Sequence, residues 1–277
     1  MIFYKMTGSG NDFVVLDGRE TTESEWPPER IRAVCHRRRG IGADGLVILS
    51  PSASGAVVMA FFNSDGSRAA MCGNAALCST RLAARLGLAG AGAGAGPDLT
   101  LQTDAGSFRT RCVGSGWEAE LNLPPFDAPV PVTEVELGEG ELFLTRATVG
   151  VPHLAVFVGD IEAPGLMERG KALRHHPGAG PDGANINFVA RPSAEGGPWP
   201  IRTYERGVEA ETLACGTGTV AVAASLADHG VTALPQSFLT RGGQILTVRG
   251  RREGGIWADV WLRGEGRLVF SAQMNDE

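Results

Sequence analysis

Two segments of this chain can form helices only if protein surrounds them on nearly every side. They read AALCSTRLAARL and TVAVAASLADH, and Ala, Val and Leu dominate both, with few charges to mark a solvent-facing side. A helix that is apolar nearly all round belongs in a core. Because short strands dominate the rest of the sequence, we expect an α+β protein in which a mostly antiparallel sheet or barrel wraps each helix.

Glycines mark the ends of these two helices. The sequence predicts them at about 73–87 and 216–229, with Gly87 and Gly230 at their C-termini. Glycine is the residue that most often follows a helix, because it adopts the left-handed conformation without strain.

A third helix, at about 28–39, is predicted from the segment PPERIRAVCHRRRG. Pro27 or Pro28 can open it, and Gly40 can stop it. The cations of Arg37–Arg39 suit the negative end of the helix dipole, so a solvated helix end is the favoured interpretation of this run. A site for anions is the alternative.

Short alternating or apolar runs bounded by Gly, Pro, Asn and Asp predict strands and hairpins. The tract LAGAGAGAGPD at 89–98 has instead the composition of a flexible surface loop. The predicted strands are DFVVLD, GLVILS, AVVMAFF, LTLQT, AELNL, HLAVFVGD, INFVA, SFLTRGGQILTVRG (a hairpin) and GIWADVWL.

The surroundings of the two apolar helices repeat along the chain. Cys72 and Cys215 stand directly before them, and a turn leading into an apolar strand lies about sixty residues before each cysteine. Nine or ten residues before each cysteine, a strand ends in polar residues, at Asn63 and at Glu205. We therefore expect an internal duplication in which each half builds a sheet around one helix, and 277 residues suffice for two such domains.

Charge and cysteine content exclude several classes of protein. The 25 basic and 31 acidic residues give a net charge of −6, which is too acidic for a protein whose main partner is nucleic acid. Five cysteines without a CxxC pair, and no apolar N-terminal segment, favour a reduced cytoplasmic protein. No apolar run approaches the roughly 18 residues that cross a bilayer, so we expect no membrane-spanning role.

A cysteine at a helix N-terminus has distinctive chemistry. The first four N–H groups of a helix lack partners within it, and the dipole places about half a positive charge there. This end can hold a carboxylate or phosphate and favours the thiolate over the thiol. Gly73, Gly216 and Gly218 beside Cys72 and Cys215 let backbone amides approach a ligand closely.

Two thiols on opposite sides of one carbon suggest proton transfer in both directions, with one cysteine as thiolate base and the other as thiol acid. We expect the two helix N-termini to face each other across an interdomain cleft that binds one anion. The backbone amides would stabilise the negative charge that spreads onto the carboxylate of the substrate. This chemistry requires no metal and no pyridoxal cofactor.

Other cysteines and histidines have simpler interpretations. Cys35, Cys78 and Cys112 are expected to be small core residues, because a lone cysteine is more often buried than reactive. His175–His176 lies in a Gly/Pro-rich segment with no matching set of metal ligands, so solvent exposure is expected.

Two rival functions use the same glycines and thiols. Gly216, Gly218 and Ala221 fit a loose G-x-G-x-x-A dinucleotide pattern, but the preceding VEAETLA is short and polar and no βαβ unit surrounds it. A thiol redox protein is the second rival, and the lack of CxxC disfavours it.

The chain resembles the diaminopimelate epimerases, pyridoxal-independent two-cysteine enzymes of lysine and peptidoglycan precursor synthesis. The matching segments follow the order of the family over nearly the whole chain, and the combination of YERG, ETLACGTG, GNDFV and MCGN is a specific signature. The segments are KMTGSGNDFVVLD, RRRGIGADGLVIL, FFNSDGS, MCGNAALC, ANINFVA and RTYERGVEAETLACGTGTVAVA.

The resemblance implies two pseudo-symmetric domains. The first would comprise 1–118, carry Cys72 and be completed by a last strand at about 265–277; the second would comprise 119–264 and carry Cys215. The implied activity interconverts LL- and meso-diaminopimelate by the two-base mechanism, with a small amino acid as the only partner apart from a second copy in a homodimer. A racemase of the same fold acting on another amino acid is the alternative, and a dinucleotide-binding oxidoreductase is a more distant one.

The resemblance also implies roles for individual residues, carried over by position. The acid/base pair is Cys72 and Cys215, and the neighbours that assist proton transfer are His153 and Glu205. The substrate contacts are Asn11, Asn63, Asn74, Asn185, Glu205 and Arg206, together with Gly73, Gly216 and Thr217 as backbone donors to the reacting carboxylate. A guanidinium such as Arg206 can bind the carboxylate at the other end of the substrate bidentately.

Three positions depart from the pattern of the family. Val151 replaces a polar residue before Pro-His and removes a side-chain hydrogen bond at the rim of the site. Ala75 and Leu77 replace a glycine and an arginine after MCGN, which changes helix packing and deletes a charge. The thiols and helix ends are unaffected, so these changes bear on substrate specificity and not on the type of reaction.

Overall fold

The structure is a computed structural model that describes residues 1–89 and 98–273. Residues 90–97, which carry most of the predicted Gly/Ala-rich loop, and residues 274–277, at the end of the predicted last strand, lie outside this description.

The chain divides into two compact units. Unit 1 comprises Met1–Asn122 and Arg263–Glu277, and unit 2 comprises Leu123–Leu262. The described residues form nineteen strands and four α-helices, which confirms the α+β prediction. In this part of the chain, none of the helices is long and apolar enough to span a bilayer.

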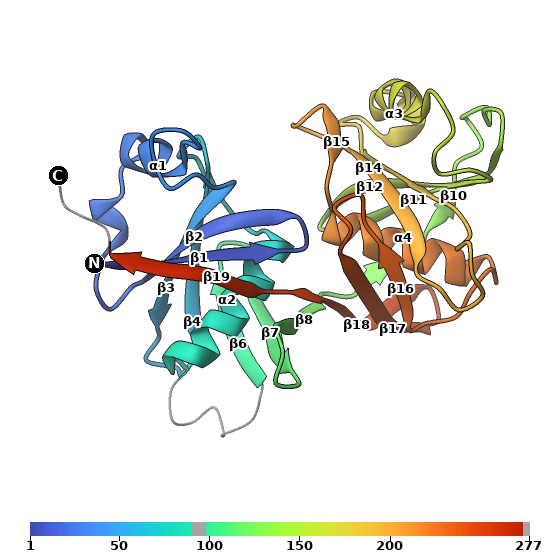
Figure 1. Cartoon of the computed structure of the whole chain (residues 1–277). Coiled ribbons are helices and arrows are strands. Elements are labelled where there is room, and N and C mark those ends of the chain that lie inside the picture. The colour runs from blue at the N-terminus through green and yellow to red at the C-terminus, as the bar shows by residue number, and fades with distance from the viewer. Residues whose placement is uncertain (90–97, 274–277) are drawn as a thin grey trace. The chain divides into compact units, whose positions relative to one another are not determined.

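Strands and helices of unit 1 are labelled in Figure 1. In chain order they are β1 (Ile2–Gly8), β2 (Asn11–Asp17), the 3-10 helix η1 (Glu23–Glu25), α1 (Pro28–Cys35), β3 (Gly45–Pro51), β4 (Val57–Asn63), β5 (Arg68–Ala69), α2 (Gly73–Leu86), β6 (Asp98–Thr103), β7 (Gly106–Val113), β8 (Glu118–Leu123) and, from the end of the chain, β19 (Arg267–Gln273).

Unit 2 has a similar series of elements. They are β9 (Phe126–Asp127), β10 (Val130–Pro131), β11 (Glu141–Val149), β12 (Val151–Val158), α3 (Leu166–Arg174), the 3-10 helix η2 (Pro177–Ala179), β13 (Asn185–Val189), β14 (Trp199–Glu205), β15 (Ala210–Thr212), α4 (Gly216–Asp228), β16 (Gln236–Leu239), β17 (Ile245–Glu253) and β18 (Ile256–Glu265), whose last residues belong to unit 1.

The strand pairing of unit 1 is repeated in unit 2. In unit 1, β1–β2 is antiparallel, β2–β3 parallel, β3–β4 and β4–β5 antiparallel, β4–β6 parallel and β6–β7 antiparallel. The pairs β11–β12, β12–β13, β13–β14, β14–β15, β14–β16 and β16–β17 follow the same sequence of directions. The helices also recur in the same places, α1 with α3 and α2 with α4. The predicted internal duplication is therefore present in the pairing of the strands.

The helices α2 and α4 are buried among the strands of their units, as predicted (Figure 1). Every residue of α4 from Gly218 to Leu226 is buried, and this helix contacts β11, β12, β13 and β17. The helix α2 contacts strands β1 to β4, β6, β7 and β19, and it ends at Gly87, whose φ is +64°. Both predicted helix spans are confirmed to within about a residue.

The end of the chain returns to unit 1. Strand β19 pairs antiparallel with β1, from Ile2 opposite Gln273 to Thr7 opposite Arg267. The rings of Phe3 and Phe270 meet edge to face with their centroids 5.9 Å apart. The N-terminal strand is thus held between β2 and the last described strand.

Two features differ from the prediction. The helix α1 ends at Cys35 and not at residue 39, so Arg37–Arg39 form a turn and not a helix end. This turn is fixed by hydrogen bonds from the N–H groups of Gly42 and Ala43 back to the last turn of α1. The helix α3 was not predicted, because it begins after a glycine in place of a capping side chain, and its sequence LMERGKALR carries another glycine in the middle.

Candidate active site

Cys72 and Cys215 occupy the same position in the two units, directly before the first turn of a buried helix. Cys72 caps α2 with φ −139° and ψ 121°, and Cys215 caps α4 with φ −132° and ψ 109°. Each cap carbonyl accepts a first helical hydrogen bond of 2.9 Å, from the N–H of Ala76 or of Thr219. Both cysteines are half-buried, and each directly precedes the first-turn N–H groups that have no partner within the helix.

Asn74, in the first turn of α2, begins a chain of side-chain hydrogen bonds in unit 1. Its Nδ2 donates to Oδ1 of Asn11 at 2.8 Å, and Nδ2 of Asn11 donates to Oδ2 of Asp44 at 3.0 Å. Asn74 is 4% exposed, and its Oδ1 has no hydrogen-bond partner within the described residues. Two predicted substrate contacts are therefore joined, and Asp44 is added to them from the segment GIGADG.

Two cations neutralise the carboxylates at the end of this chain. Nη2 of Arg37 donates to Oδ1 of Asp44 at 2.6 Å and to Oδ1 of Asp12 at 2.7 Å. Nζ of Lys5 donates to Oδ2 of Asp12 at 2.6 Å. Burial alone would raise the pKa of Asp12, but the hydrogen bonds from Arg37 and Lys5 lower it to about 2. The first arginine of the basic run is thus an ion-pair partner beside the candidate site.

Asn63 lies at the end of β4, but its side chain does not join the Asn11–Asn74 pair. Its Nδ2 donates to Oγ of Ser67 at 3.0 Å within an exposed turn. The next residue, Ser64, donates its backbone N–H to the carbonyl of Asp44 at 3.1 Å. The strand end is therefore close to Asp44, while the amide of Asn63 serves the turn.

His153 links β12 to the first turn of α4. Its Nε2 lies 3.1 Å from Oγ1 of Thr217, and that oxygen lies 3.8 Å from Sγ of Cys215. His153 is fully buried, and burial lowers its pKa to about 3, although a backbone hydrogen bond at Val149 acts in the opposite direction. The ring is therefore neutral at neutral pH, and the three side chains form a hydrogen-bonded path to the thiol.

Asn187 packs beside this histidine. Its Nδ2 lies 3.3 Å from Nδ1 of His153 and donates to the carbonyls of Leu154 at 3.2 Å and Asn185 at 3.4 Å, while its Oδ1 accepts from Oγ1 of Thr203 at 3.0 Å. Asn187 was missed in the sequence, although alternation along ANINFVA places it on the same strand face as Asn185.

The remaining predicted residues of unit 2 lie at neighbouring strand ends. Asn185 is 4% exposed, and its Oδ1 accepts the backbone N–H of Arg206 at 2.7 Å. Glu205 and Arg206 are half-buried at the end of β14. Burial raises the pKa of Glu205, so its protonated form is favoured more than in water.

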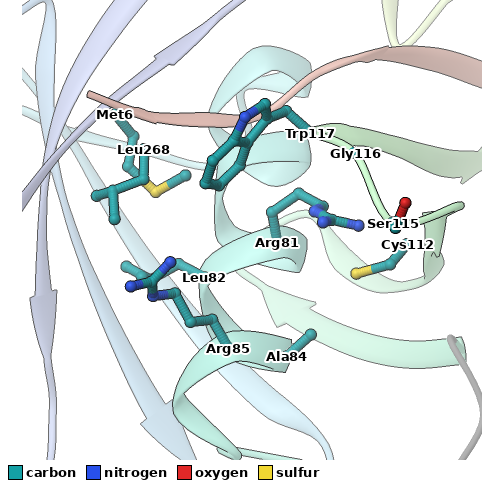
Figure 2. A pocket seen from close by; sticks show the side chains of 10 residues that line it. All are labelled: Met6, Arg81, Leu82, Ala84, Arg85, Cys112, Ser115, Gly116, Trp117 and Leu268. Carbon is teal, nitrogen blue, oxygen red and sulfur yellow. The ribbon is translucent and has the colours of Figure 1, made fainter. Parts of the chain in front are cut away.

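The other three cysteines have different surroundings. Cys35 and Cys78 are buried, as expected, and burial raises the pKa of Cys35 to about 11 and also raises that of Cys78. Cys112 is half-buried and not a core residue. It lines a pocket of about 360 Å³ in unit 1, shown in Figure 2, together with Met6, Arg81, Leu82, Ala84, Arg85, Ser115, Gly116, Trp117 and Leu268. None of the predicted site residues lines this pocket.

The adjacent histidines are only partly exposed. The side chain of His175 is 67% exposed, whereas His176 is half-buried and its Nδ1 accepts the N–H of Gly178 at 3.0 Å. The expectation of solvent exposure is therefore wrong for His176, which caps η2. Within residues 1–89 and 98–273, no three His, Cys, Asp or Glu side chains gather closely enough to hold a metal ion.

The glycines in the first turn of α4 do not form a dinucleotide site. Strand β15 precedes them, and it is three residues long and antiparallel to β14. A Cβ atom at Gly218 would collide with the side-chain amide of Asn187. Gly218 therefore permits close packing of α4 on β13. A pyrophosphate site requires a parallel strand directly before the glycines, and β15 is not parallel to its neighbour.

The three departures from the family pattern fall in two kinds of place. Ala75 and Leu77 are fully buried in α2, so they contribute to the core of unit 1. Val151 begins β12, is half-buried and pairs with Val149 across the hairpin. Val151 lies two positions from His153, and Ala75 directly follows Asn74.

Comparison with known proteins identifies the family. The diaminopimelate epimerase family model matches residues 3–118 and 145–254. The diaminopimelate epimerase of Gemmatimonas aurantiaca is 41% identical over 99% of both chains, and that of Aquifex aeolicus is 37% identical over 100% of this chain and 99% of its own. A phenazine biosynthesis PhzC/PhzF protein of Clostridium difficile shares the fold at a TM-score of 0.70, with 13% identity and 99% of each chain covered. With its two capped helices and the matched segments around both cysteines, the chain belongs to the diaminopimelate epimerase family.

Proposed function

We propose that this protein is an isomerase of lysine biosynthesis that interconverts LL- and meso-diaminopimelate, with Cys72 and Cys215 as its acid/base pair. One observation carries the proposal. Two half-buried thiols stand at the N-termini of equivalent helices in two units that share one pattern of strand pairing. Inversion of a carbon centre requires a base on one face and an acid on the other, and a duplicated scaffold can supply one from each half.

The reaction needs only these thiols and the helix ends. One thiolate removes the α-proton, so that the C–H bond breaks and an S–H bond forms. The other thiol then delivers its proton to the opposite face of the same carbon. Between these steps the electron pair spreads onto the substrate carboxylate, where the first-turn N–H groups of Gly73, Gly216 and Thr217 stabilise it.

The path from His153 supports the ionised form of Cys215. With its proton on Nε2, His153 would donate to Oγ1 of Thr217, 3.1 Å away. The Thr217 hydroxyl is then left to donate to Sγ of Cys215 at 3.8 Å, and a donor beside a thiolate favours the charged form. At the unreactive end of the substrate, we assign Arg206 to the carboxylate and Asn185 to its positioning.

Hydrogen exchange at the α-carbon tests this proposal. In D₂O without added cofactor, the protein should convert LL-diaminopimelate to the meso form and incorporate deuterium at the inverted carbon. Exchange of another amino acid, but not of diaminopimelate, would favour the alternative, a racemase of the same fold. Both thiols must stay reduced to act, which suits the cytoplasm, and sedimentation would show whether the protein is the homodimer expected from the resemblance.

A further inference from the structure

The side-chain amide of Asn11 can point in only one direction. Its Nδ2 donates to Oδ2 of Asp44 at 3.0 Å, and an ionised carboxylate has no hydrogen to donate. The amide nitrogen of Asn11 must therefore face Asp44, and its oxygen must face Asn74, whose Nδ2 donates to it at 2.8 Å. A reversed amide would set oxygen against oxygen at Asp44 and nitrogen against nitrogen at Asn74.

The same logic fixes the amide of Asn74. Its nitrogen is committed to Asn11, so its oxygen remains as the acceptor at the end of the chain. That oxygen is buried and has no partner within the described residues, and buried acceptors in proteins are rarely left unpaired. The neighbouring N-terminus of α2 favours a carboxylate. The oxygen of Asn74 beside it can accept a hydrogen bond from an ammonium group but would repel a second carboxylate.

The carboxylate of Asp44 is itself firmly oriented. Its Oδ1 accepts from Nη2 of Arg37 at 2.6 Å, and its Oδ2 accepts from the backbone N–H of Asp12 at 3.2 Å as well as from Asn11. The backbone N–H of Asp44 donates to the carbonyl of Asp12 at 2.9 Å. The backbone contacts hold Asp44 in place even without Arg37, so the two residues can be tested separately.

We propose that Asp44 is a positioning residue that sets the direction of the Asn11 and Asn74 amides, so that the oxygen of Asn74 receives an ammonium group of the substrate. The identity of that substrate as an amino acid with two ammonium groups rests on the proposed function. The direction of the amides does not, since it follows from hydrogen bonds within unit 1.

Asp44→Ala and Arg37→Gln form a pair for the test. Both lose the ion pair between residues 37 and 44, but only Asp44→Ala removes the acceptor that Asn11 requires, since an asparagine there would keep an amide oxygen. We expect Asp44→Ala to raise KM for LL-diaminopimelate about tenfold, the effect of losing one well-made hydrogen bond, with kcat changed by less than about threefold. Arg37→Gln should change KM by less than about threefold. Equal effects on KM in the two variants would overturn the proposal.

Exchanging donor and acceptor provides a rescue. In the double variant Asn11→Asp/Asp44→Asn, residue 44 donates, residue 11 accepts from both sides, and Asn74 keeps its direction. We expect the double variant to recover most of the tenfold loss, whereas Asn11→Asp alone sets two carboxylates against each other and raises KM. A double variant no better than Asp44→Ala would contradict the assigned direction.

A substrate-free measurement separates this inference from the proposed function. The side-chain amide hydrogens of Asn74, followed by NMR, should exchange slowly in the wild type and in Arg37→Gln and at least tenfold faster in Asp44→Ala, with folding checked by circular dichroism. A wild type that shows this pattern but does not epimerise diaminopimelate would refute only the proposed function. Equal exchange in the two variants would refute the role of Asp44.

Discussion

At the scale of single residues, the first prediction concerns the two thiols. Cys72→Ala and Cys215→Ala each remove one of two proton carriers, and a positioned acid or base contributes about 10²- to 10⁴-fold to rate. We expect each variant to lose at least about a hundredfold in kcat for diaminopimelate epimerisation while unfolding at the wild-type temperature. Cys112→Ala is the matched control, because this half-buried cysteine lines a separate pocket. Near-normal turnover by either of the first two variants would exclude the two-base assignment.

The second prediction at this scale follows from the burial of His153. In the unfolded chain a histidine binds a proton as the pH falls below about 6.5, whereas in the folded protein the pKa of His153 is about 3. The unfolded state therefore binds more protons between these values, and stability falls with the pH by up to about 1.4 kcal/mol per unit below pH 6.5.

Urea unfolding at pH 7.5, 6.5 and 5.5 checks this effect. We expect the wild type to lose stability across this range and His153→Gln to lose distinctly less. His175→Gln is the control, because the side chain of His175 is 67% exposed. If His153→Gln and the wild type shared one pH profile, the ring could not be buried in its neutral form.

At the scale of the helix, Gly218 decides how α4 meets the sheet. Alanine in place of glycine normally stabilises a helix by up to about 1 kcal/mol, but a Cβ at Gly218 would collide with the amide of Asn187. We expect Gly218→Ala to destabilise the protein by about 1–3 kcal/mol and to lower activity, because the collision displaces the partner of His153.

The control for this prediction is Gly87→Ala, at the C-terminus of the other buried helix, α2. The φ of Gly87 is +64°, and an added Cβ would meet nothing within 4 Å. The cost should be about 1–2 kcal/mol of backbone strain, with activity per folded molecule unchanged. Unfolding midpoints and specific activities should show that both variants are destabilised but that only Gly218→Ala loses activity. A Gly218→Ala enzyme that is destabilised but fully active would show that the helix end tolerates displacement.

The sequence predicted these helices because their signals are local. The predominance of small and apolar residues in α2 and α4, and the glycines that flank both helices, can be recognised within about fifteen residues. The helix α3 lacks such signals, since Gly170 interrupts it, and a Cβ there would meet Cβ of Tyr204 at 2.9 Å. The glycine that weakens the local pattern is thus required by packing against a distant strand.

The same distinction applies to the candidate site. Cys72 and Cys215 could be placed at helix starts from the sequence alone. Asp44 and Asn187 could not be recognised, because their partners lie far away in the chain: Asn11 is 33 positions from Asp44, and His153 is 34 from Asn187. Their roles depend on which strands pair, and strand pairing is not a local property of the sequence.

At the scale of the whole molecule, one scaffold is used twice with different chemistry. The parallel pair β2–β3 sets Phe13 opposite Gly45, and the equivalent pair β12–β13 sets His153 opposite Asn185. An apolar residue and a glycine in unit 1 thus correspond to a buried histidine and an amide in unit 2. The two thiols therefore have unequal surroundings, with ion-paired carboxylates and amides near Cys72 and a neutral histidine path at Cys215.

The last prediction concerns strand β19, which connects the end of the chain to the start. It pairs with β1 along nearly its whole length, contacts α2, and sets Phe270 against Phe3. A chain that stops at Gly266 would leave β1 as an unpaired edge and uncover part of α2. We expect hydrogen exchange followed by mass spectrometry to show lost protection in β1, β2 and α2, with loss of activity, because Cys72 depends on α2 for its position.

The strands β12 to β14 belong to unit 2 and should keep their protection. A chain that stops at Gln273 retains all of β19 and serves as the control. Equal loss of protection in both units would mean that unit 2 has no stability of its own.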